Sequence, residues 1–324
     1  MRFALIAAAF LLPSFAMAQS MLAVQGGAPQ PLTLVVSPQN PSPGGTVTVT
    51  PQSTLINLAD STVTIYINGT QIYSGSAQPV AVTLGPSGSV TKIKAVALEG
   101  GSSFTATLAL SPGSVSLVEE PLSYAPVLYA GKPLPGDGGS VRLVAVVDFR
   151  SSPTKPIPAS ALSYSWTVNG VALDNASGIG KSALVVDAPL EYRSENVVVS
   201  VESQDGSVTG GASVSITTDQ PSMRIYADDP LQGILYDHAL LGTATLTGSE
   251  GTFVAEPYSL SLAGGLPSIQ WFLNGSAAQS GNTITLRPSG SGAGTASISV
   301  TSGTSATASL DLTYGSSGGS LLGL

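Results

Sequence analysis

Apolar and polar residues alternate along short segments of this chain, and glycine- and proline-rich stretches separate the segments. Every second residue is apolar in 46–50 and in 162–168, which is the period of a strand with one buried face. Pairs such as Gly100-Gly101 and Asp205-Gly206 lie between such segments and favour tight hairpins. The pattern therefore predicts a chain built of strands and turns.

The predicted strands fall into three groups. The first group comprises 32–36, 46–50, 62–67, 71–73, 80–84, 90–98 and 104–110. The second comprises 115–118, 141–147, 162–168, 184–186, 197–201 and 214–217. The third comprises 223–227, 252–254, 269–273, 284–286, 296–300 and 310–314. Short strands with turns at this spacing are typical of an immunoglobulin-like sandwich.

One segment recurs in all three groups, an apolar strand that ends in Asn-Gly. The three copies end in Asn68-Gly69, Asn169-Gly170 and Asn274-Gly275, so the asparagines are 101 and 105 residues apart. Asn-Gly supplies two residues that tolerate positive φ, and it is a strong signal for a tight β-turn. A repeat of about 100 residues built this way indicates sandwiches in a row.

We therefore predict an all-β chain of three tandem immunoglobulin-like β-sandwich domains. The predicted boundaries are a signal peptide at 1–18, a flexible leader at 19–30, domains at 31–112, 113–220 and 221–315, and a flexible tail at 316–324.

The first residues have the pattern of a secretory signal peptide. Arg2 precedes an apolar run at 3–15, and Ala16-Met17-Ala18 forms a small-residue cleavage site before Gln19. The apolar run is shorter than the ~20 residues needed to cross a bilayer, and no later run reaches that length. We expect an exported protein, at the cell surface or in the periplasm or medium, with no membrane span after cleavage.

Composition narrows the classes of partner. Only 9% of residues are charged and the formal net charge is −8, so the chain lacks the clustered Lys and Arg that nucleic acid requires. We therefore expect no nucleic-acid partner.

Hydrophobic residues make up 43% of the chain and there is no cysteine, so hydrophobic cores without disulfides must stabilise the fold.

The central strand of the second group carries a resemblance to a known class of protein. Its motif is Tyr164-x-Trp166-x-Val168-Asn169-Gly170. This motif is similar to the central strand of immunoglobulin-like and PKD-like domains in bacterial surface proteins, and the stretch 30–315 resembles exported multi-domain proteins of small-genome bacteria. The resemblance implies adhesion or envelope scaffolding, with a surface protein or pilus-type assembly as partner. The first group departs from it, because Ile65 stands where the others have Trp166 and Trp271.

Two acidic pairs near the predicted domain boundaries are candidate metal ligands. They are Glu119, Glu120, Asp228 and Asp229, each pair followed by a proline. Adjacent carboxylates repel each other, and Ca²⁺ relieves that repulsion by taking several oxygen ligands. The sequence leaves two interpretations open, a calcium ion that stiffens each junction or a solvated bend with proline directing the chain. No other cofactor is expected.

Catalytic motifs are weak, so we expect no enzyme. His238 is the only histidine, which excludes the usual Cys/His zinc sites and Cys-His pairs within one chain. A hydrolase triad would have to use His238 beside Asp237. Glycosidase chemistry, which needs a pair of carboxylates, is not excluded by the spacing of the acidic residues alone. The stretch 177–182 ends like a phosphate-binding loop, but Asn175 replaces its first glycine, so we expect a turn there.

Tyrosines offer the alternative function, a carbohydrate-binding accessory protein. The candidates are Tyr124, Tyr129, Tyr226, Tyr236 and Tyr258. Exposed rings of this kind stack on sugars, whereas buried ones pack beneath long connections. The sequence allows both roles.

Overall fold

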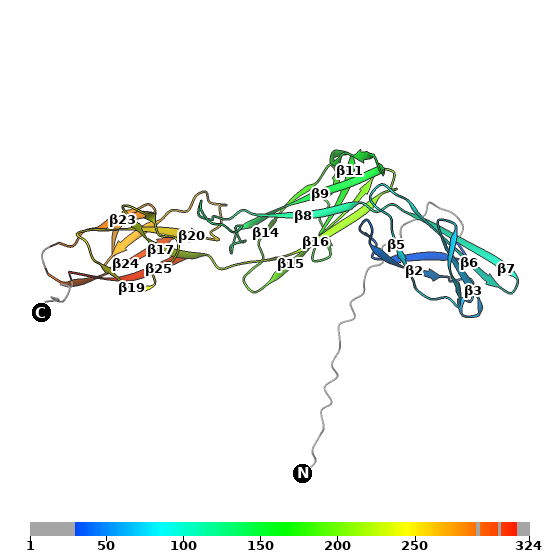
Figure 1. Ribbon diagram of the computed structural model, residues 1–324, viewed down its shortest axis with the longest axis horizontal. Coiled ribbons are helices and arrows are strands. Elements are labelled where there is room, and N and C mark those ends of the chain that lie inside the picture. The colour runs from blue at the N-terminus through cyan, green and yellow to red at the C-terminus, as the bar shows by residue number, and fades with distance from the viewer. Residues whose placement is uncertain (1–29, 290–291, 304–305, 316–324) are drawn as a thin grey trace, which may run out of the picture.

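The structure is a computed structural model, and it describes residues 30–289, 292–303 and 306–315. The predicted signal peptide, nearly all of the predicted leader and the predicted tail lie outside the described residues. The described chain is almost entirely strands, with two short 3-10 turns at Leu58–Asp60 and Ala159–Ala161. The strands form three sandwiches in a row (Figure 1).

The first sandwich has a three-stranded and a four-stranded sheet. The three-stranded sheet contains β1 (Thr33–Ser37), β2 (Thr46–Gln52) and β5 (Val80–Thr83). The four-stranded sheet contains, in order, β4 (Thr70–Gly75), β3 (Thr62–Ile67), β6 (Thr91–Glu99) and β7 (Ser102–Leu110).

The second sandwich repeats this arrangement with additions at its edges. One sheet contains β8 (Ser114–Pro121), β9 (Ser140–Ser152), β10 (Lys155–Ile157) and β14 (Ala183–Asp187). The other contains β12 (Val171–Ala172), β11 (Leu162–Val168), β15 (Ser194–Ser203) and β16 (Thr209–Thr217), with β13 (Gly178–Ile179) beside β11.

The third sandwich differs by one parallel pairing. One sheet contains β18 (Gly233–Ile234), β17 (Ser222–Asp229), β20 (Gly251–Tyr258) and β23 (Thr283–Leu286). The other contains β19 (Gly242–Leu246), β25 (Ala306–Tyr314), β24 (Gly294–Ser302), β21 (Gln270–Leu273) and β22 (Ser276–Ser280), and β19 runs parallel to β25.

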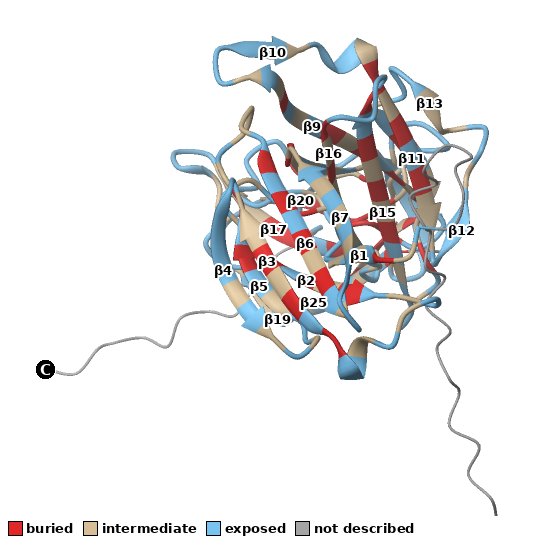
Figure 2. Ribbon diagram, turned by 90° about the vertical axis from the view of Figure 1, so that its right-hand side faces the viewer, coloured by how far each residue is buried: buried red, intermediate tan, exposed pale blue. Residues whose placement is uncertain are grey.

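Each sandwich encloses its own hydrophobic core. The three clusters of buried side chains contain Ile65, Trp166 and Trp271 respectively, and all three residues are fully buried. Buried residues alternate with exposed or intermediate ones along β6 and most of β11 (Figure 2), as the sequence pattern predicts. The fold is therefore three tandem immunoglobulin-like sandwiches, and the Asn-Gly strand is the central core strand of each.

The Asn-Gly turns have one geometry in all three domains. The asparagines have φ of 49°, 50° and 49°, and the glycines that follow have φ of 89°, 80° and 79°. Each asparagine Oδ1 also accepts a 2.9 Å hydrogen bond from a backbone N–H of the neighbouring strand, at Lys92, Asn196 and Ser297. Asparagine thus makes the turn and ties the two central strands together.

The first and second domains are joined by a bonded link. The link between β7 and β8 is only 111–113, and Gly113 N–H donates to the Thr209 carbonyl (2.7 Å) while Thr209 N–H donates to the Ser111 carbonyl (3.2 Å). A side chain on Gly113 would begin 2.0 Å from the Phe149 ring, so glycine is required there. The link is therefore part of the second domain's sheet rather than a free tether.

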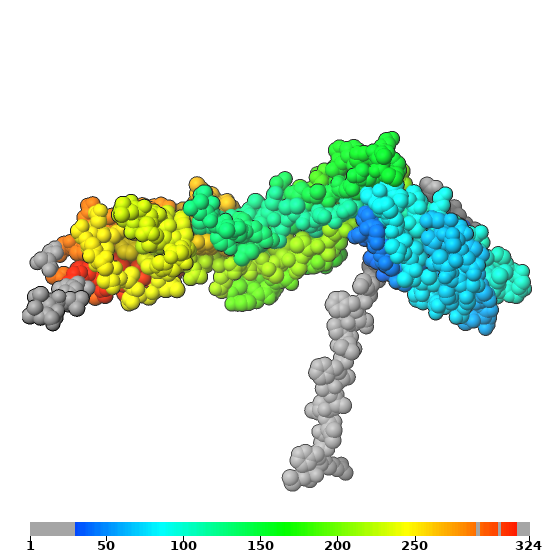
Figure 3. All heavy atoms as spheres, in the orientation of Figure 1, coloured from blue at the N-terminus to red at the C-terminus, as the bar shows by residue number. Residues whose placement is uncertain are grey.

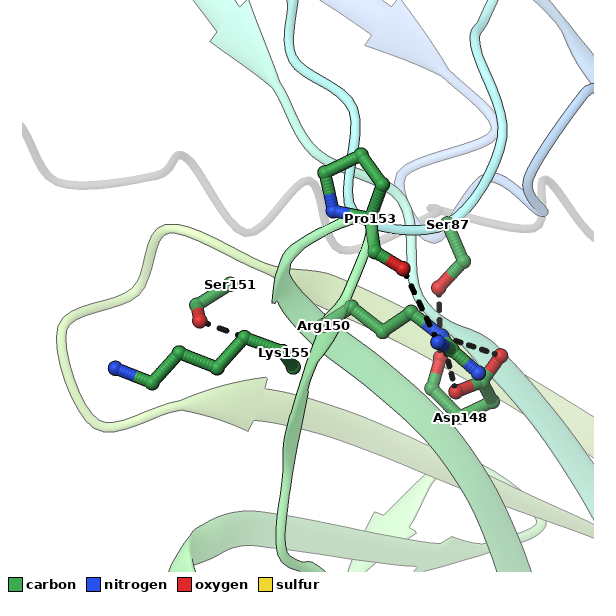
Figure 4. A network of polar contacts seen from close by, with 6 residues as sticks. All are labelled: Ser87, Asp148, Arg150, Ser151, Pro153 and Lys155. Atoms are coloured by element: carbon green, nitrogen blue, oxygen red, sulfur yellow. Dashed lines mark hydrogen bonds and ion pairs between the residues drawn. The ribbon is translucent and has the colours of Figure 1, made fainter.

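A second contact joins these domains at the hairpin of β9 and β10. Ser87 Oγ of the first domain donates to the Asp148 carbonyl (3.1 Å), and the Asp148 carboxylate holds Arg150 at 2.9 Å (Figure 4). Gly88 packs so closely on Ser152 that a Cβ would lie 2.6 Å from its carbonyl carbon. The loop of the first domain therefore rests directly on the second.

Candidate binding site between the second and third domains

A segment of the second domain pairs with the third. The connection 122–139 between β8 and β9, called here the junction segment, runs beside the end of β20. Tyr124 N–H donates to the Leu260 carbonyl (2.7 Å) and the Tyr124 carbonyl accepts from Ser259 N–H (3.0 Å). The Tyr124 side chain packs against the core of the third domain. The surfaces of these two domains meet without a visible gap (Figure 3).

Five of the ten tyrosines of the chain gather at this junction. The rings of Tyr129 and Tyr258 meet edge to face with centroids 5.6 Å apart, and those of Tyr226 and Tyr236 do so at 5.2 Å. The hydroxyls of Tyr226 and Tyr258 are hydrogen-bonded at 2.9 Å. Tyr124 joins them from the junction segment. We call these five side chains the junction tyrosines.

Beneath the junction tyrosines lies a buried carboxylate, Glu256 of β20, only 6% exposed. Tyr236 Oη donates to Glu256 Oε1 at 3.0 Å. Loss of solvation raises the pKa of Glu256, although the hydrogen bond from Tyr236 opposes that rise. Burial, followed by the bond to Glu256, raises the pKa of Tyr236 to about 12, so its hydroxyl keeps its proton at neutral pH.

A cavity of about 330 Å³ opens between the two domains at this point. Its aromatic lining comes from Tyr124, Tyr129, Tyr226 and Tyr258, and its charged lining from Lys132, Asp219 and Arg224. Four of the twelve lining residues are tyrosines, and five others are charged residues or serines. Small-ligand sites often lie at domain interfaces and combine aromatic side chains with polar groups. The arrangement can bind a ligand that has one flat face and polar substituents.

The charged groups of the cavity differ in how they are paired. Lys132 Nζ is 3.2 Å from Glu119 Oε2, and Asp219 Oδ2 accepts from Ser259 Oγ at 3.5 Å. Arg224 forms no ion pair with any residue that the structure describes. The guanidinium of Arg224 is thus the cation of this cavity that has no ion pair among the described residues.

The structure places the two acidic pairs in different domains. Glu119 and Glu120 lie near the end of β8, where Glu119 is paired with Lys132 and Glu120 with Arg142 (2.8 Å). Asp228 and Asp229 lie at the end of β17.

Asp228 sits opposite Thr252 in the sheet, and Asp229 Oδ1 accepts from two backbone N–H groups of the following turn. No group of three or more His, Cys, Asp or Glu side chains suited to a metal occurs within 30–289, 292–303 and 306–315. Calcium at these residues stays a prediction, which a Ca²⁺ titration by calorimetry would test.

His238 and the stretch 177–182 have ordinary structural surroundings. His238 Nδ1 lies 3.1 Å from Asp237 Oδ2 on an exposed connection, and that bond lowers the pKa of Asp237. The stretch 177–182 lies between β11 and β14 and contains the two-residue strand β13, with Gly180 at φ 72°. It is a turn, as the sequence predicts.

Comparison with known proteins gives structural neighbours only. No protein-family model matches the chain, and no curated protein matches its sequence. In the part of the chain that the structure describes, no helix has the length and apolar character to cross a membrane.

Several neighbours among solved structures are described as sets of domains or modules. They include three N-terminal domains of the bacteriophage RB49 outer capsid protein Hoc (12% identity, covering 87% of this chain and 98% of that chain, TM-score 0.26). Others are the fibronectin(III)-like modules of Clostridium thermocellum CbhA (14%, 58% and 94%, TM-score 0.25) and Bacteroides ovatus SGBP-B in complex with a mixed-linkage heptasaccharide (13%, 90% and 67%, TM-score 0.21). These similarities are too low to support an argument about fold or function. The fold assignment therefore rests on the sheet order described above.

Proposed function

We propose that this chain is a non-catalytic exported rod that acts as an adhesion or envelope-scaffolding module. The observation that carries the proposal is that both domain junctions are bonded. Domains in one chain move relative to each other by default unless their interface is extensive. Here backbone hydrogen bonds cross both junctions, at Ser111–Thr209 and at Tyr124–Leu260. A stiff row of sandwiches holds whatever its ends bind at a fixed distance.

Side-chain contacts add to the stiffness of the first junction. Asn40 Nδ2 of the first domain donates to Ser200 Oγ of the second at 3.0 Å, and Ser87 Oγ donates to the Asp148 carbonyl at 3.1 Å. These bonds lie on opposite sheets of the second domain, because Ser200 is on β15 and Asp148 on β9. Contacts to both sheets resist bending in more than one direction.

The rod offers edge strands to a partner. β22 (Ser276–Ser280) is the last strand of its sheet and all five of its residues are exposed. A free edge presents unpaired N–H and C=O groups that can add a strand from another protein. A surface protein or pilus-type assembly bound through such an edge is the partner that we propose.

Export is tested by the N-terminus of the protein made in its own cells. The signal-peptide pattern predicts cleavage after Ala18. N-terminal sequencing of the protein from envelope or medium fractions should therefore give Gln19 as its first residue. A full-length protein confined to the cytoplasmic fraction would contradict export.

The scaffolding role is tested by retention on cell envelopes. The mature chain, incubated with envelope fractions of the producing cells, should be retained and should capture a defined protein. A variant with a Gly-Ser insertion after Ser111 keeps every exposed surface but loosens the first junction. Loss of capture in that variant supports a role for the rod. Equal capture would show that stiffness is irrelevant, and absence of retention in both would refute the role.

Carbohydrate binding is the second candidate function, and the junction cavity is the observation that favours it. Tyr129 is 44% exposed and lies at the cavity, so one ring is available for stacking on a sugar. The other junction tyrosines are more buried and serve mainly to pack the domains together. A glycan array probed with the mature chain and with Tyr129→Ala tests this function, and binding to no glycan would exclude it.

A further inference from the structure

Arg224 has an unusual position for a charged residue of this chain. It lies on β17 between Ser222 and Tyr226 of the same sheet face, directly opposite Glu256 of β20. Such a cross-strand pair normally brings opposite charges together. Glu256 bonds instead to Tyr236, and Arg224 lines the cavity and has no ion pair among the described residues.

An arginine in this state is suited to a carboxylate. The planar guanidinium binds a carboxylate through two parallel N–H···O bonds, which are among the strongest hydrogen bonds in proteins. The second cation of the cavity, Lys132, is already paired with Glu119. The net charge of the chain is −8, so the protein as a whole repels anions. Selectivity for an acidic ligand must therefore come from the guanidinium of Arg224.

The remaining lining suits a sugar ring. Tyr129 presents an exposed ring at the cavity, fixed in orientation by its edge-to-face contact with Tyr258. Asp219 is exposed and lines the cavity, where its carboxylate can accept hydrogen bonds from sugar hydroxyls. The volume of about 330 Å³ is near the lower end of the range for small-molecule sites, about 300–1,000 Å³, and fits one sugar unit of a longer chain.

We propose that the junction cavity binds a uronic acid unit of an acidic polysaccharide, with the sugar carboxylate on Arg224 and the ring against Tyr129. This inference rests on the proposed carbohydrate-binding function and specifies its ligand. Tyr129 belongs to the junction segment of the second domain and Arg224 to the third. A bound sugar therefore contacts both domains, and binding strengthens the junction.

The test is calorimetric titration of the mature chain with a short oligogalacturonate and with its methyl ester. The two probes share ring and linkage and differ only in the carboxylate. The acid should bind, and the ester should bind at least about tenfold more weakly because it cannot form the charge-assisted pair. Equal binding of both probes, or no binding of the acid, overturns the proposal. Binding of sodium acetate as tightly as the acid would show an anion site without sugar recognition and also overturns it.

Variants assign the binding to this cavity. Arg224→Gln should weaken binding of the acid by about tenfold or more, and Arg224→Lys should bind the acid more tightly than Arg224→Gln does. Tyr129→Ala should weaken binding of the acid, whereas Tyr129→Phe should leave it unchanged. Arg287→Gln, which removes an exposed arginine of the same domain paired with Glu250, is the matched control and should leave binding unchanged. Undiminished binding by Arg224→Gln contradicts the site.

The same samples separate this proposal from the broader ones. Glycan-array binding to neutral sugars alone would keep the carbohydrate-binding function and refute the acidic ligand. Small-angle scattering of each variant reports whether the rod remains extended. If the unmodified chain is an extended rod but does not bind the acid, only the ligand site is refuted and the scaffolding role is untouched.

Discussion

Asparagine at the end of each central strand performs two physical tasks at once. It adopts positive φ in the turn, and its Oδ1 accepts a backbone hydrogen bond from the adjacent strand in all three domains. Glycine can do the first task but not the second. This double demand explains why the same dipeptide recurs although the strands that precede it differ.

Substitution of Asn169 separates these two tasks. Asn169→Gly keeps the turn and loses the bond to Asn196, so it should lower the free energy of unfolding of the second domain by about 1 kcal/mol. Asn169→Ala adds the cost of positive φ, about 1 kcal/mol more. Urea unfolding followed by Trp166 fluorescence in a Trp271→Phe background measures both. Asn175→Ala, an exposed asparagine of the same domain, is the control, and equal effects of all three would contradict the assignment.

Glu256 predicts a specific pH dependence of the third domain. Because burial raises its pKa in the folded state, the folded protein holds the proton to higher pH than the unfolded chain does. The stability of the third domain should therefore fall as pH rises from the ordinary carboxyl range through the raised pKa, and should be level on either side. Glu256→Gln should remove that step.

The measurement is the melting temperature of the third domain against pH, for the unmodified chain and for Glu256→Gln. Glu202→Gln, which removes an exposed carboxylate of the second domain, controls for net charge and should keep the step. A third domain whose stability rises with pH over this window would contradict the raised pKa.

At the scale of single residues, the sequence predicted roles that depend on local chemistry. The turn at Asn169-Gly170 and the core position of Trp166 follow from propensity and alternation. The bond from Asn196 to Asn169 could not be predicted, because it depends on the register between β11 and β15. The contact between the rings of Tyr129 and Tyr258 also could not be predicted, because it joins two domains.

At the scale of elements, β20 and the junction segment depart from the expected pattern. β20 should alternate between buried and exposed residues, yet five consecutive residues from Phe253 to Pro257 are buried. Its inner face packs in the core, and Tyr236 lies over Glu256 of its outer face. The burial of Glu256 is the local consequence, because a strand covered on both faces leaves no solvent for an outward carboxylate.

Removal of Tyr124 tests the junction segment. Tyr124 belongs by sequence to the second domain but packs on the core of the third. Tyr124→Ala should therefore destabilise the third domain by about 2 kcal/mol, less than the 3–5 kcal/mol typical of fully buried aromatics, and leave the second nearly unchanged. Calorimetry that resolves the domain transitions checks this. Tyr192→Ala, which removes a 91% exposed ring, is the control, and a loss confined to the second domain would contradict the packing.

The strands that the sequence did not predict are short strands at or near sheet edges. They are β10, β12, β13, β18, β19 and β22. Half-buried alternation identifies strands with one face on a core, and edge strands such as β22 have no buried residue. β19 is fixed by parallel pairing with β25, about 70 residues later in the chain, which no local pattern encodes.

At the scale of the whole molecule, the number of sandwiches followed from the repeat, whereas the way they are joined did not. In the structure, Gly113 and Gly88 allow close approach of the backbone at the first junction, and the long connection 122–139 folds against the third domain. Hydrogen bonds and close packing between neighbouring domains therefore hold both connections in place.

Small-angle X-ray scattering of the mature chain in solution tests whether the hydrogen-bonded junctions make the chain a stiff rod. A stiff rod should give the profile of one extended particle whose maximum dimension matches the described structure, with a clear fall of the normalised Kratky curve at high angle. A Gly-Ser insertion after Ser111 should broaden the distance distribution. If the profile of the unmodified chain requires an ensemble of freely jointed domains and matches that of the insertion variant, the junctions are not stiff.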